Sequence, residues 1–401
     1  MKSLTRITTR LLAVAAFVAI APAQAQTPGV SANEIVIGLF APLSGPLVGF
    51  GLDPLNASKM IYDDVNAKGG INGRKIRVVI EDDKCTGNEL VGAVKKLVSV
   101  DKVFLLHGGS CTASVAAAQE FVTREKVPFV LLNAAGDNVV FPSSRYIFGA
   151  FVGTQRTFGS ALAQFGMESL KAKRMAIIVH DDDYGKANLA AAKAVVERLG
   201  GSVVTQERVP LGITDVTAPM LNIRASKPDV ILSGLYPAPA VLLAQKYAEF
   251  GMTATPLLQS VQGIPTPSVY AKNVDNPDAL KNLYYNWAFT DIINESVRTK
   301  FTTMYKKSYP DREPGAYMLS GIPSAQAVVD ALQRAGKDLT REKFVDAMEK
   351  LNLQSEVMMG PLQFTADRHD ALRSVGIIKY DGTTRKAMPG TYVWNGKDGA
   401  L

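Results

Sequence analysis

Short apolar runs alternate with amphipathic segments along most of this 401-residue chain. The run EIVIGLF at 34–40 is bounded by turn residues, as is typical of a strand buried on both faces of a sheet. In the segment 56–66, Ala57, Ile61 and Val65 are spaced by four, so a helix would place them on one face. The alternation therefore predicts buried strands that are each followed by a helix.

The alternation forms two series, and each predicts a parallel sheet covered by helices on both faces. The first series predicts strands at 34–40, 75–81, 103–107 and 128–132, with helices at 56–66, 87–100 and 112–125. The second predicts strands at 174–180, 202–208, 229–235 and 255–259, with helices at 185–199, 215–226 and 238–250. The C-terminal part predicts helices near 292–307, 315–335 and 340–350 and short β runs at 361–365, 374–380 and 391–395. We therefore expect an α/β fold of two lobes with a cleft between them.

Residues 108–112 (GGSCT) stand where a predicted strand ends and a helix begins. Ligands of open parallel sheets bind beyond the carboxyl ends of the strands, so this position is a candidate site. Free backbone N–H groups and the dipole at a helix N-terminus attract an anion, and the hydroxyls of Ser110 and Thr112 would add to them. The alternative is a plain N-cap, in which Ser110 or Thr112 accepts a hydrogen bond from the helix backbone.

A catalytic serine is a weaker interpretation of Ser110. The chain has no G-x-S-x-G sequence, and its three histidines are His107, His180 and His369. His107 lies three residues before Ser110 at a strand end, where a packed or solvent-facing histidine is more common. The segment also departs from G-x-G-x-x-G and from the phosphate-binding loop pattern, so we expect neither an enzyme nor a bound cofactor.

The next predicted strand ends in three small residues, Ala134, Ala135 and Gly136. Small side chains at this position would let a ligand approach the main chain. The alternative is a tight turn between the strand and the next helix, without any contact to a ligand.

Aromatic residues follow strands of the second series. Tyr184 and Tyr236 each stand just after a predicted strand, where a ring could stack on a ligand or donate from its hydroxyl. The acidic residues 181–183 are adjacent, so their side chains diverge, and a cap is the better interpretation than a metal site. Trp287 and Phe289 lie at the expected junction of the lobes, where they could line the cleft or pack the hinge.

The first 25 residues differ from the rest of the chain. Three basic residues precede an apolar stretch at 11–20, and Ala-Gln-Ala at 23–25 is typical of a signal-peptidase site. We expect a secretory signal peptide that is removed after Ala25, and hence a periplasmic protein. Its removal lowers the formal net charge from +7 to +4, and the remaining basic residues are interspersed, so a nucleic-acid partner is disfavoured.

The chain has two cysteines, Cys85 and Cys111. In an exported protein an even number of cysteines suggests a disulfide. The alternative is two free buried thiols. A metal-binding or catalytic pair is disfavoured, because neither cysteine has a second ligand nearby in the sequence.

Four stretches resemble the bacterial periplasmic solute receptors of the leucine/isoleucine/valine-binding type. They are EIVIGLFAPLSGPLVGFG, DVNAKGGINGRKIRVVIEDDKCTGNE, HDDDYG and MGPLQF, in the family's order and spacing. The resemblance covers about 33–395 and implies two Rossmann-like lobes joined by three crossovers. It places 33–152 with 286–358 in lobe 1 and 153–285 with 359–396 in lobe 2. It also implies a monomer that delivers a small solute to an inner-membrane ABC permease.

The resemblance further implies which residues surround the ligand. In this family the segment matching 109–112 receives the ligand's carboxylate, with help from the segment matching 134–136. The family's disulfide falls on Cys85 and Cys111. The residues that the resemblance places around the ligand are Phe50, Gly109, Ser110, Cys111, Thr112, Ala134, Ala135, Gly136, Tyr184 and Tyr236.

One departure from the family's pattern bears on the ligand. Amino-acid binders of this family place a carboxylate in the loop that matches 259–263, and the matching residue here is Gln262. A neutral amide does not offset a buried ammonium as a carboxylate does, and Phe50 replaces a common tyrosine. We therefore expect a carboxylate ligand without an α-ammonium group, an aromatic or other apolar acid, with an amino acid as the alternative. Arg156 could pair with the carboxylate, or it could be a surface arginine.

Overall fold

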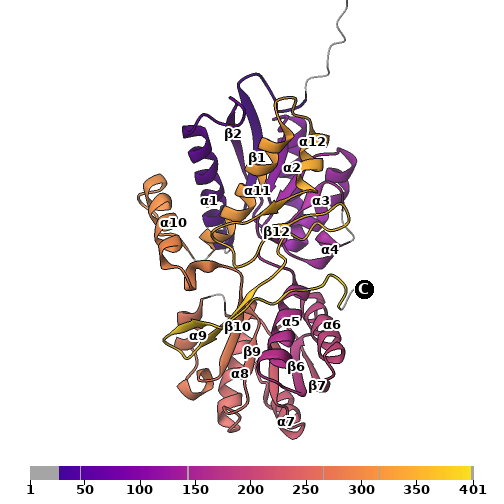
Figure 1. The fold of residues 1–401 in the computed structure, drawn as a ribbon, viewed down its shortest axis with the longest axis vertical. Helices are drawn as coiled ribbons and strands as arrows, with labels where there is room; N and C mark the ends of the chain where they lie inside the picture. Colours follow the sequence, from indigo (N-terminus) through magenta and orange to yellow (C-terminus); the bar gives the residue numbers. More distant parts are fainter. Residues whose placement is uncertain (1–26, 46, 142–143, 265, 316, 399–401) are drawn as a thin grey trace, which may run out of the picture.

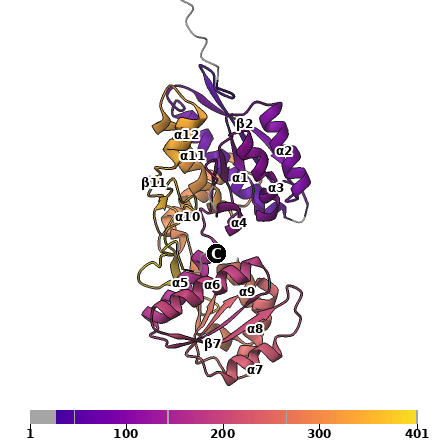
Figure 2. The same ribbon diagram turned by 90° about the vertical axis from the view of Figure 1, so that its right-hand side faces the viewer.

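The computed structural model describes residues 27–45, 47–141, 144–264, 266–315 and 317–398. The predicted signal peptide lies outside these residues. The described chain forms two lobes, one above the other in Figure 1 and again in the perpendicular view of Figure 2. Each lobe is built around one sheet, as the two predicted series require.

The first lobe contains a five-stranded parallel sheet in the order β2-β1-β3-β4-β5. Its strands are β1 (Glu34–Ala41), β2 (Lys75–Asp82), β3 (Leu105–Gly108), β4 (Phe129–Leu131) and β5 (Ile147–Phe148). Its helices from the N-terminal part are α1 (Val48–Ala67), α2 (Gly87–Ser99), α3 (Thr112–Arg124) and α4 (Asp137–Val140). Figure 1 shows that helices from the C-terminal part complete this lobe: α10 (Glu295–Ser308), α11 (Gly321–Ala335) and α12 (Arg341–Met348).

Strand β1 explains why the run at 34–40 is uniformly apolar. Ile35 and Ile37 belong to the core beneath α1, α11 and α12, whereas Val36 and Phe40 pack with α2 and α3. All four side chains are at most 5 % exposed. Because helices cover both faces of the sheet, neither face of the strand tolerates a polar stripe.

The second lobe contains a seven-stranded sheet in the order β14-β13-β10-β9-β8-β6-β7. Its parallel strands are β6 (Arg174–His180), β7 (Ser202–Val209), β8 (Val230–Gly234), β9 (Leu257–Gln259) and β10 (Leu283–Trp287). Strands β13 (Gly376–Tyr380) and β14 (Arg385–Ala387) extend it as an antiparallel edge. Its helices are α5 (Gln155–Gln164), α6 (Asp183–Arg198), α7 (Thr217–Ala225), α8 (Pro237–Glu249) and α9 (Pro267–Lys272).

The chain passes between the lobes three times, after β5, after β10 and before β13. A small antiparallel pair, β11 (Asn352–Leu353) and β12 (Leu362–Gln363), precedes the third passage. The short turns of helix are η1 (Phe165–Ser169), η2 (Val261–Gly263), η3 (Pro277–Leu280), η4 (Thr290–Ile292) and η5 (Met318–Ser320). Across the described residues, no helix combines the length and apolar character that a bilayer crossing demands.

Helix α1 begins at Val48, eight residues before its predicted start at 56, and continues through Pro54. A proline inside a helix lacks the N–H that would bond to the carbonyl four residues earlier. Here that carbonyl belongs to Phe50, and the side-chain Nδ2 of Asn133 donates to it at 2.9 Å. A residue from the end of β4 thus replaces the missing backbone hydrogen bond.

Smaller differences from the predicted elements lie at the lobe boundary and in the C-terminal part. Helix α5 and strands β10 and β14 were not predicted, and α11 begins at Gly321, later than the expected 315. The β run predicted at 391–395 is reduced to one bridge between Val375 and Tyr392. Helix α11 packs against α1 and α12, and β14 pairs with β13, so the bounds of these elements depend on contacts with other elements as well as on local periodicity.

Candidate functional site

The entrance to α3 presents a buried hydroxyl group without a partner. Ser110 is 2 % exposed, and its Oγ has no hydrogen-bond partner among the described residues. Cys111 is the N-cap residue and makes no side-chain capping bond, so the plain N-cap expected from Ser110 or Thr112 is not observed. The first N–H groups of α3 have no intrahelical partners, because a helix leaves its first four donors free. The position can therefore supply both a hydroxyl and backbone donors to an anion.

The small-residue segment after β4 lies directly against this entrance. Gly136 donates its N–H to Thr112 Oγ1 at 3.2 Å, and Ala134 donates its N–H to the Gly109 carbonyl at 3.1 Å. A Cβ on Gly136 would come within 2.0 Å of Thr112 Cγ2, so a larger residue would push the two segments apart. Gly109 has φ +74°, which favours glycine. The structure thus brings together the two segments on which the expected carboxylate site depends.

Cys85 and Cys111 form the disulfide that the sequence suggested, with their Cα atoms 5.5 Å apart. The bond joins the loop before α2 to the first turn of α3. It therefore restrains the loop that carries Ser110.

His107 is not placed to activate Ser110. Its Nδ1 lies 2.7 Å from the Tyr62 hydroxyl, and its Nε2 lies 3.1 Å from Ser324 Oγ, so both ring nitrogens are engaged. The ring is fully buried, and this burial lowers the pKa of His107 to about 3. His107 is therefore a packed, neutral core histidine.

The aromatic candidates of the second lobe form one stack. Tyr184 stacks on Tyr236 with ring centroids 4.8 Å apart, and Tyr236 stacks on His180 at the same distance. The Tyr184 hydroxyl donates to Ser260 Oγ at 2.8 Å, and burial raises the pKa of this hydroxyl. The backbone N–H of Tyr236 donates to His180 Nε2 at 3.1 Å. Because Nε2 accepts this hydrogen bond, the N–H of the imidazole ring is at Nδ1. These contacts hold Tyr184 and Tyr236 in fixed positions at the strand ends.

The acidic residues after β6 act as a cap. Asp182 is the N-cap of α6, and its side chain accepts a hydrogen bond from the Gly185 N–H at 2.8 Å. The side chain of Asp183 is fully exposed, and Asp181 lies 3.5 Å from Arg208. These side chains diverge, as their adjacency in the sequence requires.

Arg156 is buried rather than on the surface. It is 4 % exposed, and its Nε lies 2.9 Å from Asp137 Oδ2. Its guanidinium also lies over the rings of Phe141 and Trp394. Arg156 therefore has a counter-charge within the protein, across the boundary between α4 and α5, and the structure corrects the alternative of a surface arginine. A contact between Arg156 and a ligand stays a prediction.

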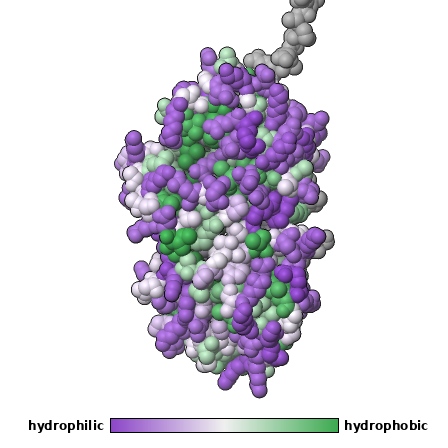
Figure 3. All heavy atoms as spheres, viewed as in Figure 1, coloured by the Kyte–Doolittle hydropathy of each residue, from purple (hydrophilic) through white to green (hydrophobic). Residues whose placement is uncertain are grey.

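A cavity of about 80 Å³ lies between the lobes and brings two candidate residues together. Phe50 lines it from α1 and Gln262 from η2. Trp287 lines it from the end of β10, and Phe289 lines it from the passage that follows. Each aromatic of the junction therefore faces a cavity. Figure 3 shows apolar side chains at the waist between the lobes. The described residues that line this cavity include no Asp, Glu, Lys or Arg.

Two asparagines that the sequence did not single out also line this cavity. Asn133 donates through Nδ2 to Phe50, which leaves its buried Oδ1 without a partner. Asn286 accepts the Val261 N–H through Oδ1 at 3.0 Å, which leaves its buried Nδ2 without a partner. Asn133 follows a predicted strand, and this position was an available signal, whereas β10 was not predicted and no signal pointed to Asn286. Their free acceptor and donor are suited to a polar group of a ligand.

The sequence profile described as "Periplasmic binding protein" matches residues 34–385. The chain belongs to the periplasmic binding protein family. This periplasmic binding protein is 28 % identical, over 76 % of its own length and 79 % of the relative's, to an "Amino acid binding protein" of Pseudomonas aeruginosa. The family assignment confirms the resemblance seen in the four sequence stretches.

Two solved structures show the same fold. One is the branched-chain amino acid transporter substrate binding protein LivJ of Streptococcus pneumoniae with isoleucine, with TM-score 0.69, 22 % identity and coverage of 90 % and 99 % of the two chains. The other is a solute binding protein from R. palustris with 4-hydroxybenzoate, with TM-score 0.70, 22 % identity and coverage of 90 % and 97 %. Proteins of this fold are thus described with both an amino acid and an aromatic acid.

Proposed function

We propose that this protein is the extracytoplasmic substrate-binding component of an ABC importer, exported after cleavage behind Ala25. It captures a small solute that carries a carboxylate, and it delivers this solute to an inner-membrane permease as a monomer. An aromatic or other apolar acid is the favoured ligand. The family, the two-lobe fold and the names of the relatives support this role.

In this proposal the carboxylate binds at the N-terminus of α3. Ser110 Oγ and the first backbone N–H groups of α3 donate to its oxygens, and the segment 134–136 lies alongside. The N-terminal helix dipole adds a favourable field. A hydrogen bond to a charged group contributes about 1.5–3 kcal/mol. A few such bonds together with apolar burial are sufficient for micromolar binding, about 8 kcal/mol.

The main support for the proposed ligand class is that the described residues lining the smaller cavity carry no charge. An α-ammonium group in a desolvated site needs a carboxylate partner, since an unpaired charge is costly to bury. Gln262 and Asn133 offer neutral amide oxygens instead, and Phe50 adds an aromatic edge. An acid without an ammonium group leaves no charge unmatched among these residues.

Hinge closure follows from the position of the cavity. Phe50 belongs to the first lobe and Gln262 to the second, so a ligand that contacts both stabilises the arrangement in which the lobes meet. In the second lobe, the stacked rings of Tyr184 and Tyr236 would provide further contacts to the ligand. The permease would then recognise the closed form.

An amino acid is the second candidate. The curated relative is named an amino acid binding protein, and the structure from S. pneumoniae contains isoleucine. In this alternative the ammonium group would be bound by amide oxygens and by aromatic faces, without a carboxylate.

Matched ligands that differ only in the ammonium group test the proposal. Thermal shift and isothermal titration calorimetry would compare 3-phenylpropionate with phenylalanine, and 4-methylpentanoate with leucine. We expect the acids without an ammonium group to raise the unfolding midpoint and bind more tightly. Gln262→Glu should reverse this order, because it adds the missing counter-charge. Binding of the amino acids alone to the wild type would refute the ligand class.

A further inference from the structure

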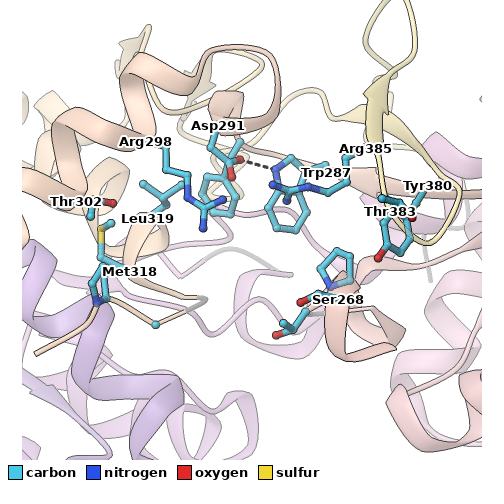
Figure 4. Close-up of a pocket in the computed structure, with 15 residues that line it drawn as sticks. Ser268, Trp287, Asp291, Arg298, Thr302, Met318, Leu319, Tyr380, Thr383 and Arg385 are labelled. Carbon is cyan, nitrogen blue, oxygen red and sulfur yellow. Dashed lines mark hydrogen bonds between the residues drawn. The ribbon is translucent and has the colours of Figure 1, made fainter. Parts of the chain in front are cut away.

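A second and larger cavity, of about 370 Å³, lies on the other side of Trp287 and Phe289. These two side chains line both cavities, so the two spaces are neighbours that share an aromatic wall. The larger cavity differs from the smaller one in its charge. Arg298, Arg385 and Asp291 line it, and Figure 4 shows these side chains around Trp287.

The two arginines come from different lobes. Arg298 extends from α10, which packs against α1 in the first lobe, and Arg385 extends from β14 at the edge of the second sheet. In the view of Figure 4, Arg298 and Arg385 both lie close to Trp287. Both groups remain accessible, because Arg298 is exposed and Arg385 is half-buried.

Within the part of the chain that the structure describes, neither guanidinium is paired with a carboxylate. Among the described residues, no carboxylate oxygen lies within 4.0 Å of Arg298 or Arg385, whereas Arg156 has such a partner in Asp137. The carboxylate among the described lining residues is Asp291, which is 8 % exposed and whose Oδ1 accepts the Trp287 indole N–H at 2.8 Å. The cavity therefore has two positive groups against one negative group that is already bound.

We propose that the larger cavity binds a second negatively charged group of the solute, so that the transported molecule is a diacid. This inference rests on the proposed function. One carboxylate lies at the N-terminus of α3, the body of the molecule lies along Trp287 and Phe289, and the second carboxylate lies between Arg298 and Arg385. A guanidinium group binds a carboxylate through two parallel hydrogen bonds. A lysine ammonium group lacks this planar, paired arrangement of donors, so arginine is the better carboxylate binder.

The origin of the arginines in separate lobes gives this site a role in closure. An anion held by both guanidinium groups links α10 to β14 directly. Without the anion, approach of the two lobes brings two positive charges together. The second acid group therefore favours the closed form, whereas a monoacid leaves the repulsion in place.

Matched mono- and diacids provide the test. Calorimetry would compare benzoate with terephthalate and hexanoate with adipate, on the full mature protein. We expect at least one diacid to bind about 10-fold or more tightly than its monoacid partner, as a charged hydrogen-bonded pair implies. Arg298→Gln and Arg385→Gln should each remove most of this preference by weakening diacid binding, and monoacid affinity should stay equal or rise, because one of the two repelling charges is gone. Arg224→Gln, an exposed arginine on α7, is the control and should change neither.

The outcomes separate the two proposals. If monoacids bind and no diacid binds better, or if the diacid preference survives in both arginine variants, the second anion site is refuted and the proposed function stands. If neither monoacids nor diacids bind the wild type, the proposed function fails, and the diacid site fails with it. A Ser110→Ala variant should weaken monoacids and diacids equally, which distinguishes the first carboxylate site from the second.

Discussion

Replacement of Ser110 by alanine should separate ligand binding from stability. The Ser110 hydroxyl is 2 % exposed and has no partner among the described residues, so its removal breaks no hydrogen bond in the unliganded protein. An unsatisfied buried polar group costs about 1–3 kcal/mol, so the unliganded variant should be as stable as the wild type or more stable. In the complex, the loss of one charge-assisted bond of about 1.5–3 kcal/mol should raise Kd about 10- to 100-fold.

Ser114→Ala is the matched control on the same helix. Ser114 is 1 % exposed, and its Oγ donates to the Cys111 carbonyl at 2.8 Å, so this hydroxyl is already satisfied. Its removal should lower the free energy of unfolding by about 0.5–1.5 kcal/mol and change Kd little. Urea unfolding and calorimetry, with the tightest-binding acid of the panel, measure both quantities. A Kd for Ser110→Ala within twofold of the wild type would refute the placement of the carboxylate.

Three further predictions concern the framework of the site. Replacing both Cys85 and Cys111 by alanine should lower the free energy of unfolding by about 2–4 kcal/mol, since their disulfide restrains the unfolded chain. Urea unfolding measures this change, and an unchanged unfolding midpoint would contradict the prediction. Gly136→Ala should weaken acid binding and destabilise the protein by about 1–3 kcal/mol, because its Cβ would collide with Thr112, and retention of both properties would count against the tight contact. Burial raises the pKa of Asp83 to about 6, so the folded state binds the proton of this carboxyl more tightly than the unfolded state does. The free energy of unfolding should therefore fall as the pH rises from about 4 to about 6. Asp83→Asn should flatten that decline in pH-dependent urea unfolding, and an identical slope in both proteins would refute the assignment.

Much of the fold could be predicted from local patterns. The apolar runs at 34–40 and 174–180 are strands β1 and β6, because a strand covered on both faces must be apolar throughout. The N-terminus of α1 could not be predicted, because Pro54 normally ends a helix. The helix continues through Pro54, and the Phe50 carbonyl that the proline leaves unpaired accepts a hydrogen bond from Asn133, 83 positions away from Phe50.

For the candidate site, too, the sequence indicated some features and the tertiary structure decided others. The hydroxyl and glycine residues at 108–112 follow a strand and open a helix, so the sequence indicated their position in the fold. The state of each side chain depended on distant partners. Ser110 proved to be buried without a partner, whereas Arg156 proved to be paired with Asp137.

By itself, the sequence determined the α/β class, the two series and the carboxyl-end loops, since these follow from local periodicity and from short-range turn chemistry. It also suggested the disulfide, because the chain has two cysteines behind an export signal. Only the tertiary structure decided which side chains share a cavity. Phe50 and Gln262 line one cavity although they belong to different lobes, and the same is true of Arg298 and Arg385 in the larger cavity. Charged and amide side chains that are distant in the sequence become neighbours only when the folded core fixes their positions. A local sequence pattern contains no information about which distant residues will be neighbours.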